Sequence, residues 1–504
     1  MFYTFVEMKI SIIEILLILA PFLSYSQKQG NIWYFGNGDG LDFNNVTPAS
    51  ISGGQTGTNV TSGDVQEGTA CISDSAGHLL FYTDGMYIWN RNHDPMPNGT
   101  GLMGGTSSTQ SSIIVPLPGS NSIYYVFTAD DFSGYDHFPE IQNGYRYSVI
   151  DMCLNDSLGG VIDGQKNILL VDSSTEKIAA CADENGSGYW IMGHKMFSDE
   201  FHAWHLTSDG ISETVISHIG TVHGFYDNAL DWSPGAQGQM QFNSQGTKLA
   251  VAISNIEPGI LEIFDFNNAT GTVSNTCQIL IDNDTLFGKR IYGIEFSPDG
   301  TKLYAAVSGS IIPKRLYQFD LISGNGNCNA VISSRQTLFQ SNTTTILRGM
   351  QLAPNGKIYT VCDSYYNLGC INFPNLSGLA ADFNPFSITL PQFNSYTLPS
   401  FIAGYKYHNQ LPCTDYVPEE IIIPNVFTPN VDNINDTFII KNLPANSTVQ
   451  IYNRWGALVS EWANPNGSWD GHTKGGSQVS AGVYYYIVTL PDGERKKGFI
   501  QLIR

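Results

Sequence analysis

Short apolar runs recur along residues 31–405, and turns rich in Gly, Pro, Asn and Asp separate them. Alternation of apolar and polar positions is the period of a strand with one buried face, and the runs are too short for helices. The chain contains 51 Gly, 26 Tyr and 27 Phe in 504 residues, and only 14% of its residues are charged. The pattern therefore predicts an all-β protein of short strands joined by tight turns.

One strand–turn–strand unit repeats along the chain. The clearest copy spans residues 294–307 and continues at 316–321, with similar copies at 240–266 and 349–361 and looser ones beginning at 71, 113 and 180. A Gly such as Gly300 supplies the positive φ that closes each hairpin, and we expect the following Lys302 to face solvent. One such sheet cannot bury both faces alone, but several sheets packed radially can, so the repeats predict a β-propeller.

The two ends of this region complement each other. Residues 33–35 and 41–43 match the second and third strands of a unit whose first strand is missing, and residues 399–405 could supply that strand. A seventh blade built from both ends would close the ring, at about 54 residues per blade; six or eight blades are the alternatives. Residues 31–410 resemble the WD-repeat-like and YVTN-type β-propellers, a similarity that indicates fold rather than function.

The first 26 residues have the features of a secretory signal peptide. Met8-Lys9 is followed by a mostly apolar stretch at 10–23 and by small residues before Gln27. Glu14 interrupts the stretch at a cost of about 2.5–3.5 kcal/mol, which the surrounding Ile and Leu residues offset. No later stretch reaches 18 apolar residues, so we do not expect the mature chain to span a membrane.

Charge and cysteine usage narrow the class of protein. A net charge of -21 repels phosphate groups, which argues against nucleic acid and anionic membranes as partners. The eight cysteines form no Cys-x-x-Cys pair, so zinc and thioredoxin-like chemistry have no support. Cys71 and Cys181 lie in apolar strands and are expected to be free, buried thiols. We expect one or two disulfides, with Cys362–Cys370 as the best local pair.

No catalytic motif stands out. The sequence contains no Gly-x-Ser-x-Gly, His-Glu-x-x-His or phosphate-binding loop. His202 and His205 lie three apart on a predicted strand and face opposite ways, so with His194 they are interpreted as ordinary packing residues. Loops at the mouth of a propeller usually contact its ligand, although they can also be plain solvated connections. The ligand-binding candidates in such loops are Arg91, His93, Asp94, Asp130, Asp131, Asp136 and His137.

The tail is a separate unit. Residues 412–420 are predicted to link a propeller at 27–411 to a small Ig-like β-sandwich at 421–504, where six or seven short strands are expected. By contrast with the acidic remainder, residues 418–504 hold seven Lys/Arg and eight Asp/Glu. Its distinctive clusters contain Asn453, Arg454, Trp455, Gly456, Trp469, Asp470, Gly471, Lys497, Gly498 and Arg504.

These clusters, with residues 424–430 and 482–486, resemble the gliding motility-associated C-terminal domain, the type B sorting domain of the type IX secretion system. The resemblance implies contact with the type IX machinery. It also implies export from a Bacteroidetes-type bacterium, through the periplasm, to the medium or the outer cell surface. Val431 and Asn433 stand where this family usually has glycine.

The loop at 430–436 offers a possible weak Ca²⁺ site at Asp432, Asn435 and Asp436. It has only two carboxylates and no distal bidentate Glu, so an Asx-rich turn is the competing interpretation. No other cofactor is expected.

The sequence thus favours a secreted or cell-surface propeller that binds a glycan or protein ligand rather than an enzyme. The alternatives are an extracellular polysaccharide lyase or hydrolase, and a structural component of the gliding or adhesion apparatus.

Overall fold

The computed structural model describes residues 28–57, 67–131, 143–212, 214–224, 235–254, 258–281, 290–308, 314–341, 347–362, 366–391, 395–404, 421–430, 435–441, 443, 447–463, 467–490 and 494–504. Within these ranges the elements are strands, apart from α2 (Cys328–Ser333) and the 3-10 turns η1 (Ser323–Gly326) and η2 (Gly378–Ala381). The all-β prediction is confirmed. The predicted signal peptide, the linker at 412–420 and Cys413 lie outside the described residues.

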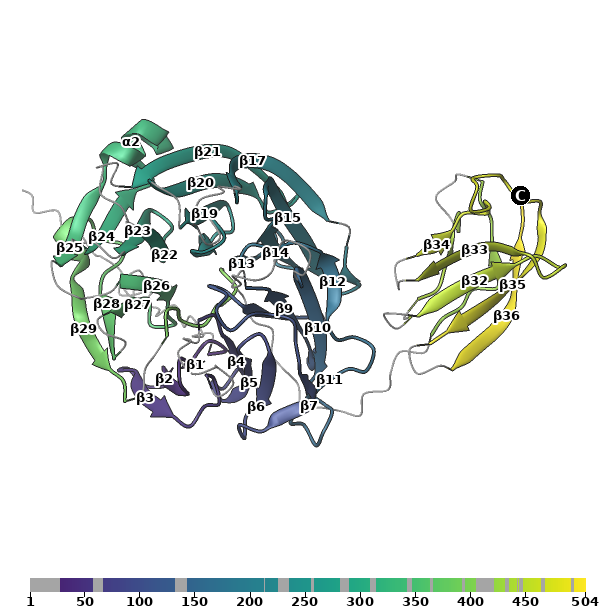
Figure 1. The fold of residues 1–504 in the computed structure, drawn as a ribbon, viewed down its shortest axis with the longest axis horizontal. Helices are drawn as coiled ribbons and strands as arrows, with labels where there is room; N and C mark the ends of the chain where they lie inside the picture. The colour runs from purple at the N-terminus through teal and green to yellow at the C-terminus, as the bar shows by residue number, and fades with distance from the viewer. Residues whose placement is uncertain are drawn as a thin grey trace, which may run out of the picture.

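In the part of the chain that the structure describes, seven sheets follow one another around a central axis (Figure 1). The first three sheets are β1 (Ile32–Phe35), β2 (Asp39–Asp42) and β3 (Ala49–Ser52); β4 (Ala70–Ser73), β5 (Leu79–Thr83), β6 (Tyr87–Asn90) and β7 (Pro95–Thr100); and β8 (Ser112–Pro116), β9 (Ile123–Ala129), β10 (Tyr145–Asp151), β11 (Gly160–Val161) and β12 (Ile168–Val171). The fourth and fifth are β13 (Ile178–Ala182), β14 (Tyr189–His194), β15 (Ser198–Thr207), β16 (Gly210–Ile211) and β17 (Val215–His223); and β18 (Met240–Phe242), β19 (Lys248–Ile253), β20 (Gly259–Asn267) and β21 (Thr272–Ile281). The sixth and seventh are β22 (Arg290–Phe296), β23 (Lys302–Ser308), β24 (Lys314–Asp320) and β25 (Gln336–Ser341); and β26 (Leu347–Leu352), β27 (Ile358–Cys362), β28 (Asn367–Ile371) and β29 (Phe383–Thr389).

The hydrophobic core is divided among the gaps between sheets. Each pair of neighbouring sheets shares its own cluster of buried apolar side chains. The first and seventh sheets also share one, in which the Trp33 and Tyr359 rings lie 6.2 Å apart. Both faces of each sheet are therefore covered by neighbours, and the ring is closed by side-chain packing. This is the radial arrangement that the repeated unit predicts.

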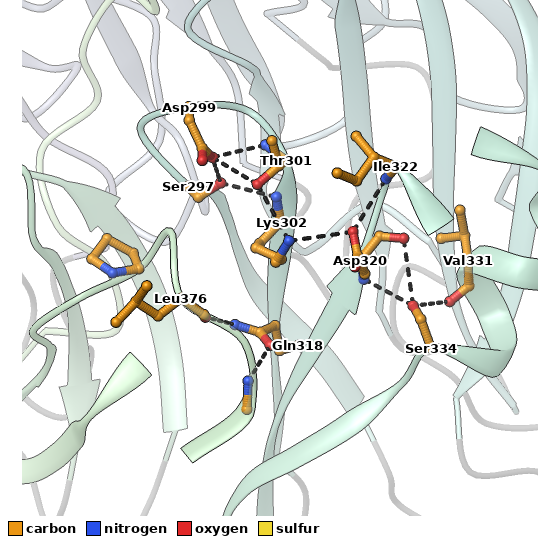
Figure 2. A network of polar contacts seen from close by, with 12 residues as sticks. Ser297, Asp299, Thr301, Lys302, Gln318, Asp320, Ile322, Val331, Ser334 and Leu376 are labelled. Atoms are coloured by element: carbon orange, nitrogen blue, oxygen red, sulfur yellow. Dashed lines mark hydrogen bonds and ion pairs between the residues drawn. The ribbon is translucent and has the colours of Figure 1, made fainter. Parts of the chain in front are cut away.

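The repeated turn forms as predicted. The turn glycine has a φ between 63° and 92° in all six units. In the sixth sheet, Ser297 donates its hydroxyl to Asp299 at 2.6 Å, and Asp299 accepts the backbone N–H of Thr301 at 3.0 Å (Figure 2). The turn therefore satisfies its own polar groups. The six turn glycines are Gly77, Gly119, Gly186, Gly246, Gly300 and Gly356.

The lysine after this turn is not exposed, which corrects the sequence-based expectation. Lys302 is only 5% exposed, and its ammonium lies 3.3 Å from the Asp320 carboxylate (Figure 2). The reason is strand register, because Lys302 at the start of β23 pairs with Asp320 at the end of β24. Lys248 binds Asp265 in the same way in the fifth sheet.

The prediction that residues 399–405 supply the first strand of the closing blade is wrong. Residues 395–404, which we call the strap, do not pair with β1; Figure 1 shows the green strap crossing the inside of the ring. Ser400 forms a parallel bridge with Ala70 of β4, and Ala403 forms one with Cys181 of β13. The first sheet therefore has three strands and no innermost strand among the described residues, so the count of seven blades stays a prediction.

The cysteines are only partly as expected. Cys71 and Cys181 are buried and free, as predicted. Cys277 and Cys328 form a disulfide that ties β21 to the start of α2, and Cys153 is also disulfide-bonded. The prediction of a Cys362–Cys370 disulfide is wrong, since both residues are unoxidised thiols. Cys362 pairs with Asn367 and Cys370 with Tyr359, which separates the two along the hairpin.

Residues 421–504 form a small sandwich with its own core, as predicted. A five-stranded sheet has the order β30-β36-β35-β32-β33, and β31 pairs with β34 in a second sheet. Phe438 and Trp469 of the small sheet share a cluster of buried side chains with Val449, Tyr484 and Ile500 of the large one. The strands are β30 (Val426–Phe427), β31 (Phe438–Ile439), β32 (Thr448–Tyr452), β33 (Leu458–Ala463), β34 (Ser468–Trp469), β35 (Gly482–Thr489) and β36 (Arg495–Leu502).

Candidate functional site

The predicted ligand-binding residues fall at two different ends of the ring. Arg91, His93 and Asp94 follow β6, the third strand of its sheet, at the end where the innermost strand stops. Asp130 and Asp131 follow β9, a second strand, at the end where the innermost strand begins. The structure therefore separates the two groups. Asp136 and His137 lie outside the described residues.

At the first of these ends, His93 has a packing role. Its Nδ1 lies 3.0 Å from the Tyr82 hydroxyl, and its ring contacts the edge of Tyr34 at 5.2 Å. Burial lowers the pKa of His93, so the ring is held neutral. Arg91 and Asp94 are exposed on the same turn.

Asp130 organises a connection at the other end. It is 9% exposed and accepts the backbone N–H of Asn143 at 2.7 Å and that of Asp131 at 3.0 Å. It thereby holds together the two ends of the connection between β9 and β10. Burial raises the pKa of Asp130 to about 6. Asp131 is half-buried and accepts the N–H of Ser107 at 3.4 Å.

Backbone hydrogen bonds link the segments that lead into the innermost strands. Because neighbouring starts are bonded to each other, all these strands begin at one end, which we call the entry end. The bonds are Gly68 N to Ser108 O at 2.9 Å, Gln110 N to Glu176 O at 2.9 Å, Glu176 N to Ala236 O at 3.2 Å, Gln239 N to Tyr292 O at 2.9 Å and Gly349 N to Tyr396 O at 2.9 Å.

Polar side chains from five sheets meet at the entry end. Thr109 donates its hydroxyl to the Glu176 carboxylate at 2.9 Å, and Tyr292 donates its hydroxyl to Glu67. The Arg348 guanidinium carbon lies 3.5 Å from the ring centre of Tyr396 and 5.4 Å from that of Tyr292. We call this group the central collar, and it consists of Glu67, Thr109, Glu176, Lys177, Tyr292 and Arg348.

Lys177 is the most deeply buried charged group of the central collar. Its side chain is fully buried, and its Nζ donates to the backbone carbonyls of Gly235 at 2.7 Å, Ala236 at 2.5 Å and Gln237 at 2.9 Å. These three bonds use every ammonium hydrogen. Burial lowers the pKa of Lys177 to about 7, against the attraction of the Glu176 carboxylate.

The two glutamates of the central collar have raised pKa values. Burial raises the pKa of Glu67 to about 8, and the charge of Glu176 adds to the rise. Burial likewise raises the pKa of Glu176 to about 7, against the hydrogen bond from Thr109. Around neutral pH the central collar therefore changes charge easily, and it can supply either carboxylic acid or carboxylate.

Several residues in or beside the central collar are partly exposed, among them Ser107, Asp131, Arg348 and Tyr396. Among the described residues, the Nε of Arg348 has no hydrogen-bond acceptor. Sequence reasoning missed the central collar. The sequence feature that could have revealed the central collar is the placement of its residues. In several repeats a polar residue stands immediately before the first strand or at its start.

The histidines do not gather into a metal site. His202 Nε2 lies 2.9 Å from Glu200, whereas His205 Nε2 lies 3.2 Å from Asp183 and its ring stacks on Trp190. His194 stacks on His223 at 3.7 Å, and burial lowers the pKa of His194 to about 3. Within the described ranges, no three or more His, Cys, Asp or Glu residues are placed to share a metal ion.

The tail clusters divide into a core group and a surface group. Trp469 is 1% exposed and donates its Nε1 to the carbonyl of His472 at 2.7 Å. Asp470 accepts the N–H of His472 at 3.0 Å, and Arg504 donates to the carbonyl of Gly471 at 3.2 Å. This group therefore anchors the C-terminal strand to the sandwich.

The second cluster forms an exposed turn between β32 and β33. Asn453 accepts the N–H groups of Trp455 and Ala457, each at 3.0 Å, and Gly456 has a φ of 75°. The Arg454 guanidinium lies 4.3 Å from the ring centre of Trp455, which is 76% exposed. On β36, Lys497 is exposed, and a side chain at Gly498 would collide with the Tyr486 hydroxyl.

The loop proposed for Ca²⁺ is only partly described, because Asp432 lies outside the described residues. Asp436 accepts the N–H of Asn430 at 3.0 Å, and Asn435 accepts that of Thr428 at 2.8 Å. These bonds close the loop by themselves. The weak Ca²⁺ site stays a prediction.

Comparison with known proteins identifies the tail. Residues 421–502 match the family model of the CHU_C type IX secretion signal domain, which confirms the resemblance found in the sequence. The chain therefore carries a signal for export to the cell surface or the medium. The sequence matches none of the curated proteins with which it was compared. No described helix has the length and apolarity needed to cross a membrane.

Several solved structures are distantly similar to this chain. Hydrazine synthase of Kuenenia stuttgartiensis is 11% identical, with 70% of this chain and 94% of that one covered and a TM-score of 0.41. PorZ, an essential surface component of the type IX secretion system of Porphyromonas gingivalis, is 12% identical, with coverages of 95% and 82% and a TM-score of 0.29. The periplasmic gluconolactonase of Pseudomonas aeruginosa is 11% identical, with coverages of 77% and 92% and a TM-score of 0.35. At these identities no function carries over to this chain.

Proposed function

We propose that this chain is a secreted or cell-surface β-propeller that binds a glycan or protein ligand at its entry end. The observation that carries the proposal is the convergence of polar side chains from five sheets in the central collar. Buried polar groups cost free energy unless they are paired, so a ring that needed only stability would favour apolar contacts at this position. Convergent polar groups at the mouth of a repeat fold are typical of ligand sites.

The opposite end offers less to a ligand. It holds the repeated turns, in which Ser297, Asp299 and Thr301 satisfy one another. It also holds the last residue of the strap, because a side chain on Gly404 would meet the Ser244 carbonyl of one such turn. The last described residue of the strap, Gly404, therefore lies at the end away from the central collar.

The partly exposed rim suggests the chemistry of the ligand. Arg348 is partly exposed, and the Tyr396 ring lies against its guanidinium. Asp131 is half-buried nearby, at the base of a neighbouring connection. A guanidinium, an aromatic ring and a carboxylate together suit a ligand rich in hydroxyl and carboxylate groups, such as an acidic glycan or a protein loop.

A glycan array and a panel of extracellular matrix and cell-surface proteins, probed with the full chain, test this function. Replacing Arg348 by Ala should weaken binding at least about tenfold, as loss of a central contact does. Arg91→Ala, an exposed arginine at the opposite end, is the matched control and should leave binding unchanged. Absence of any ligand across both panels, or equal loss in the two variants, would refute the proposal.

The runner-up is an extracellular polysaccharide hydrolase or lyase. The observation in its favour is the pair of carboxyl groups with raised pKa values beside the Tyr292 hydroxyl, since such groups serve as general acids and bases. Their burial weighs against it, because Glu67 is 4% and Glu176 is 1% exposed. Release of reducing ends or unsaturated sugars from any polysaccharide, abolished by Glu67→Gln, would favour the enzyme.

A further inference from the structure

The five-stranded sheet of the tail exposes apolar side chains on its outer face. On β35, Tyr484 and Val488 point into the core, whereas Val483 and Tyr485 are 41% and 48% exposed. On β36, Ile500 is fully buried and Phe499 is 55% exposed. The solvent face of a mainly antiparallel sheet such as this one is normally polar, so the exposed apolar residues need another explanation.

Strand register brings these side chains into one continuous row. Tyr485 pairs with Phe499 on one side and with Tyr452 on the other, and Tyr452 pairs with Leu458, which is 42% exposed. Directly paired residues lie on the same face of a sheet. The row therefore crosses four strands.

A second row runs beside the first. Val483 pairs with Gln501, and Gln501 pairs with Val426, which is 39% exposed. Both rows belong to one face because Val483 stands two positions from Tyr485. We call this surface the outer apolar face, and it consists of Val426, Tyr452, Leu458, Val483, Tyr485 and Phe499. Contiguous exposed apolar surface of this kind marks an interface in soluble proteins.

Positive charge borders the outer apolar face. Lys497 and Arg495 lie on the same face of β36, two and four positions from Phe499. Arg454 stacks on the exposed Trp455 in the turn that joins Tyr452 to Leu458. The one carboxylate paired into this face, Glu461, is bound by Lys474. An occupant would therefore present an apolar strip bordered by carboxylates.

We propose that the outer apolar face is the surface by which the type IX export machinery holds this chain, through a machinery protein with an apolar strip bordered by carboxylates. The inference rests on the export part of the proposed function and extends it from the domain to a surface. Two observations select this occupant. The secretion signal model covers all six residues of the face. The net charge of residues 418–504 is close to zero, and three of their seven cations border this one face.

The test compares two pairs of substitutions in the full chain, expressed in a bacterium with a working type IX system. Tyr485→Ser with Phe499→Ser removes two residues of the outer apolar face. Ile422→Ser with Ile439→Ser is the matched control, because these residues are 55% and 48% exposed and lie outside the five-stranded sheet. The first pair should lower the exported fraction at least about tenfold and leave the chain inside the cell, as loss of two interface anchors does. The control should be exported normally.

Two further readouts keep the result decisive. Thermal melting of both purified variants shows whether the tail still folds. A photo-crosslinking residue at position 499, with one at 439 as control, should attach to a type IX component in the otherwise unchanged chain. Normal export of the first pair, equal loss in both pairs, or crosslinking only to a second copy of this chain would overturn the proposal. If deletion of residues 421–504 stops export while the outer-face variants do not, only this inference fails and the export signal stands.

Discussion

The two folded parts of the chain depart from ordinary burial in opposite directions. In the ring, neighbouring sheets cover each other's faces, and charged groups such as Lys177 and Glu176 are inside. In the tail, the two-layer sandwich leaves one sheet face to solvent, and aromatic residues such as Phe499 are on it. Ionisable groups in the interior and contiguous apolar patches on the surface are both uncommon. Each exception marks the part of its domain where an outside partner gives the best explanation.

The largest expected effect comes from deleting the tail, which should abolish export but leave the ring folded. Deleting residues 421–504 leaves every sheet of the ring and the strap intact, so the ring should still fold. Export should be lost, because the deleted residues contain the secretion signal. Fractionation of cells and medium measures this, with melting of the retained protein as the control. Normal release of the shortened chain would show that the export signal lies outside residues 421–504.

Two tryptophans test the division between core and surface inside the tail. Trp469→Ala should destabilise the sandwich by about 4 kcal/mol, because it empties a buried site against Phe427 and Tyr484. Trp455→Ala should change the free energy of unfolding by less than about 0.5 kcal/mol, since the ring is mostly exposed. Urea unfolding followed by circular dichroism gives both values. Similar losses in the two variants would contradict the division.

Two lysines make the same comparison in the ring. Lys177→Met leaves three backbone carbonyls without their donor and removes the cation beside the buried Glu176, so we expect a loss of about 3 kcal/mol in stability. Lys248→Met breaks an ion pair that is 40% exposed on both sides and should cost less than about 1 kcal/mol. Chemical unfolding of the full chain measures both. A small effect at Lys177 would show that its three hydrogen bonds do not contribute to stability.

The last comparison concerns the dependence of stability on pH. The folded state keeps the proton of Glu67 up to about pH 8, whereas the ordinary pKa of the group is 4.5. The contribution of Glu67 to stability is therefore complete below pH 4.5 and is lost as the pH rises through 8, by at most about 1.4 kcal/mol per pH unit. Glu67→Gln stays neutral and should flatten the curve between pH 5 and 8. Because the Glu67 and Glu176 titrations are coupled, the difference between the two proteins measures Glu67 together with its effect on Glu176. Parallel curves for the two would refute its role.

Local sequence was sufficient for the parts of the fold that local forces decide. The turn at Gly300 needs a positive φ and its own short hydrogen bonds, and both are properties of neighbouring residues. The tail was identified for a similar reason, since Trp469 and Gly471 are fixed by a small core that depends on few residues. Strand order alone also places Arg91 and Asp130 at opposite ends, so this separation was available from the repeats.

Tertiary partners decided what the sequence did not reveal. From the sequence alone Lys302 is expected at the surface. The register of β23 and β24 instead places it opposite Asp320. The strap looks like a strand for β1, yet its partners are Ala70 and Cys181, which belong to two sheets separated by a third. The central collar is assembled from segments more than 200 residues apart, as in the contact between Tyr292 and Glu67.

The strap also limits how early in synthesis the ring can finish folding. Its Phe401 ring lies 5.6 Å from Trp33, so the first strand of the chain is covered by one of the last residues of the ring to be synthesised. At about 5–20 residues per second, a ribosome needs about 18–74 s to synthesise the chain from Trp33 to Phe401. During that time the early strands lack their final cover and have to be shielded by other proteins or remain unfolded.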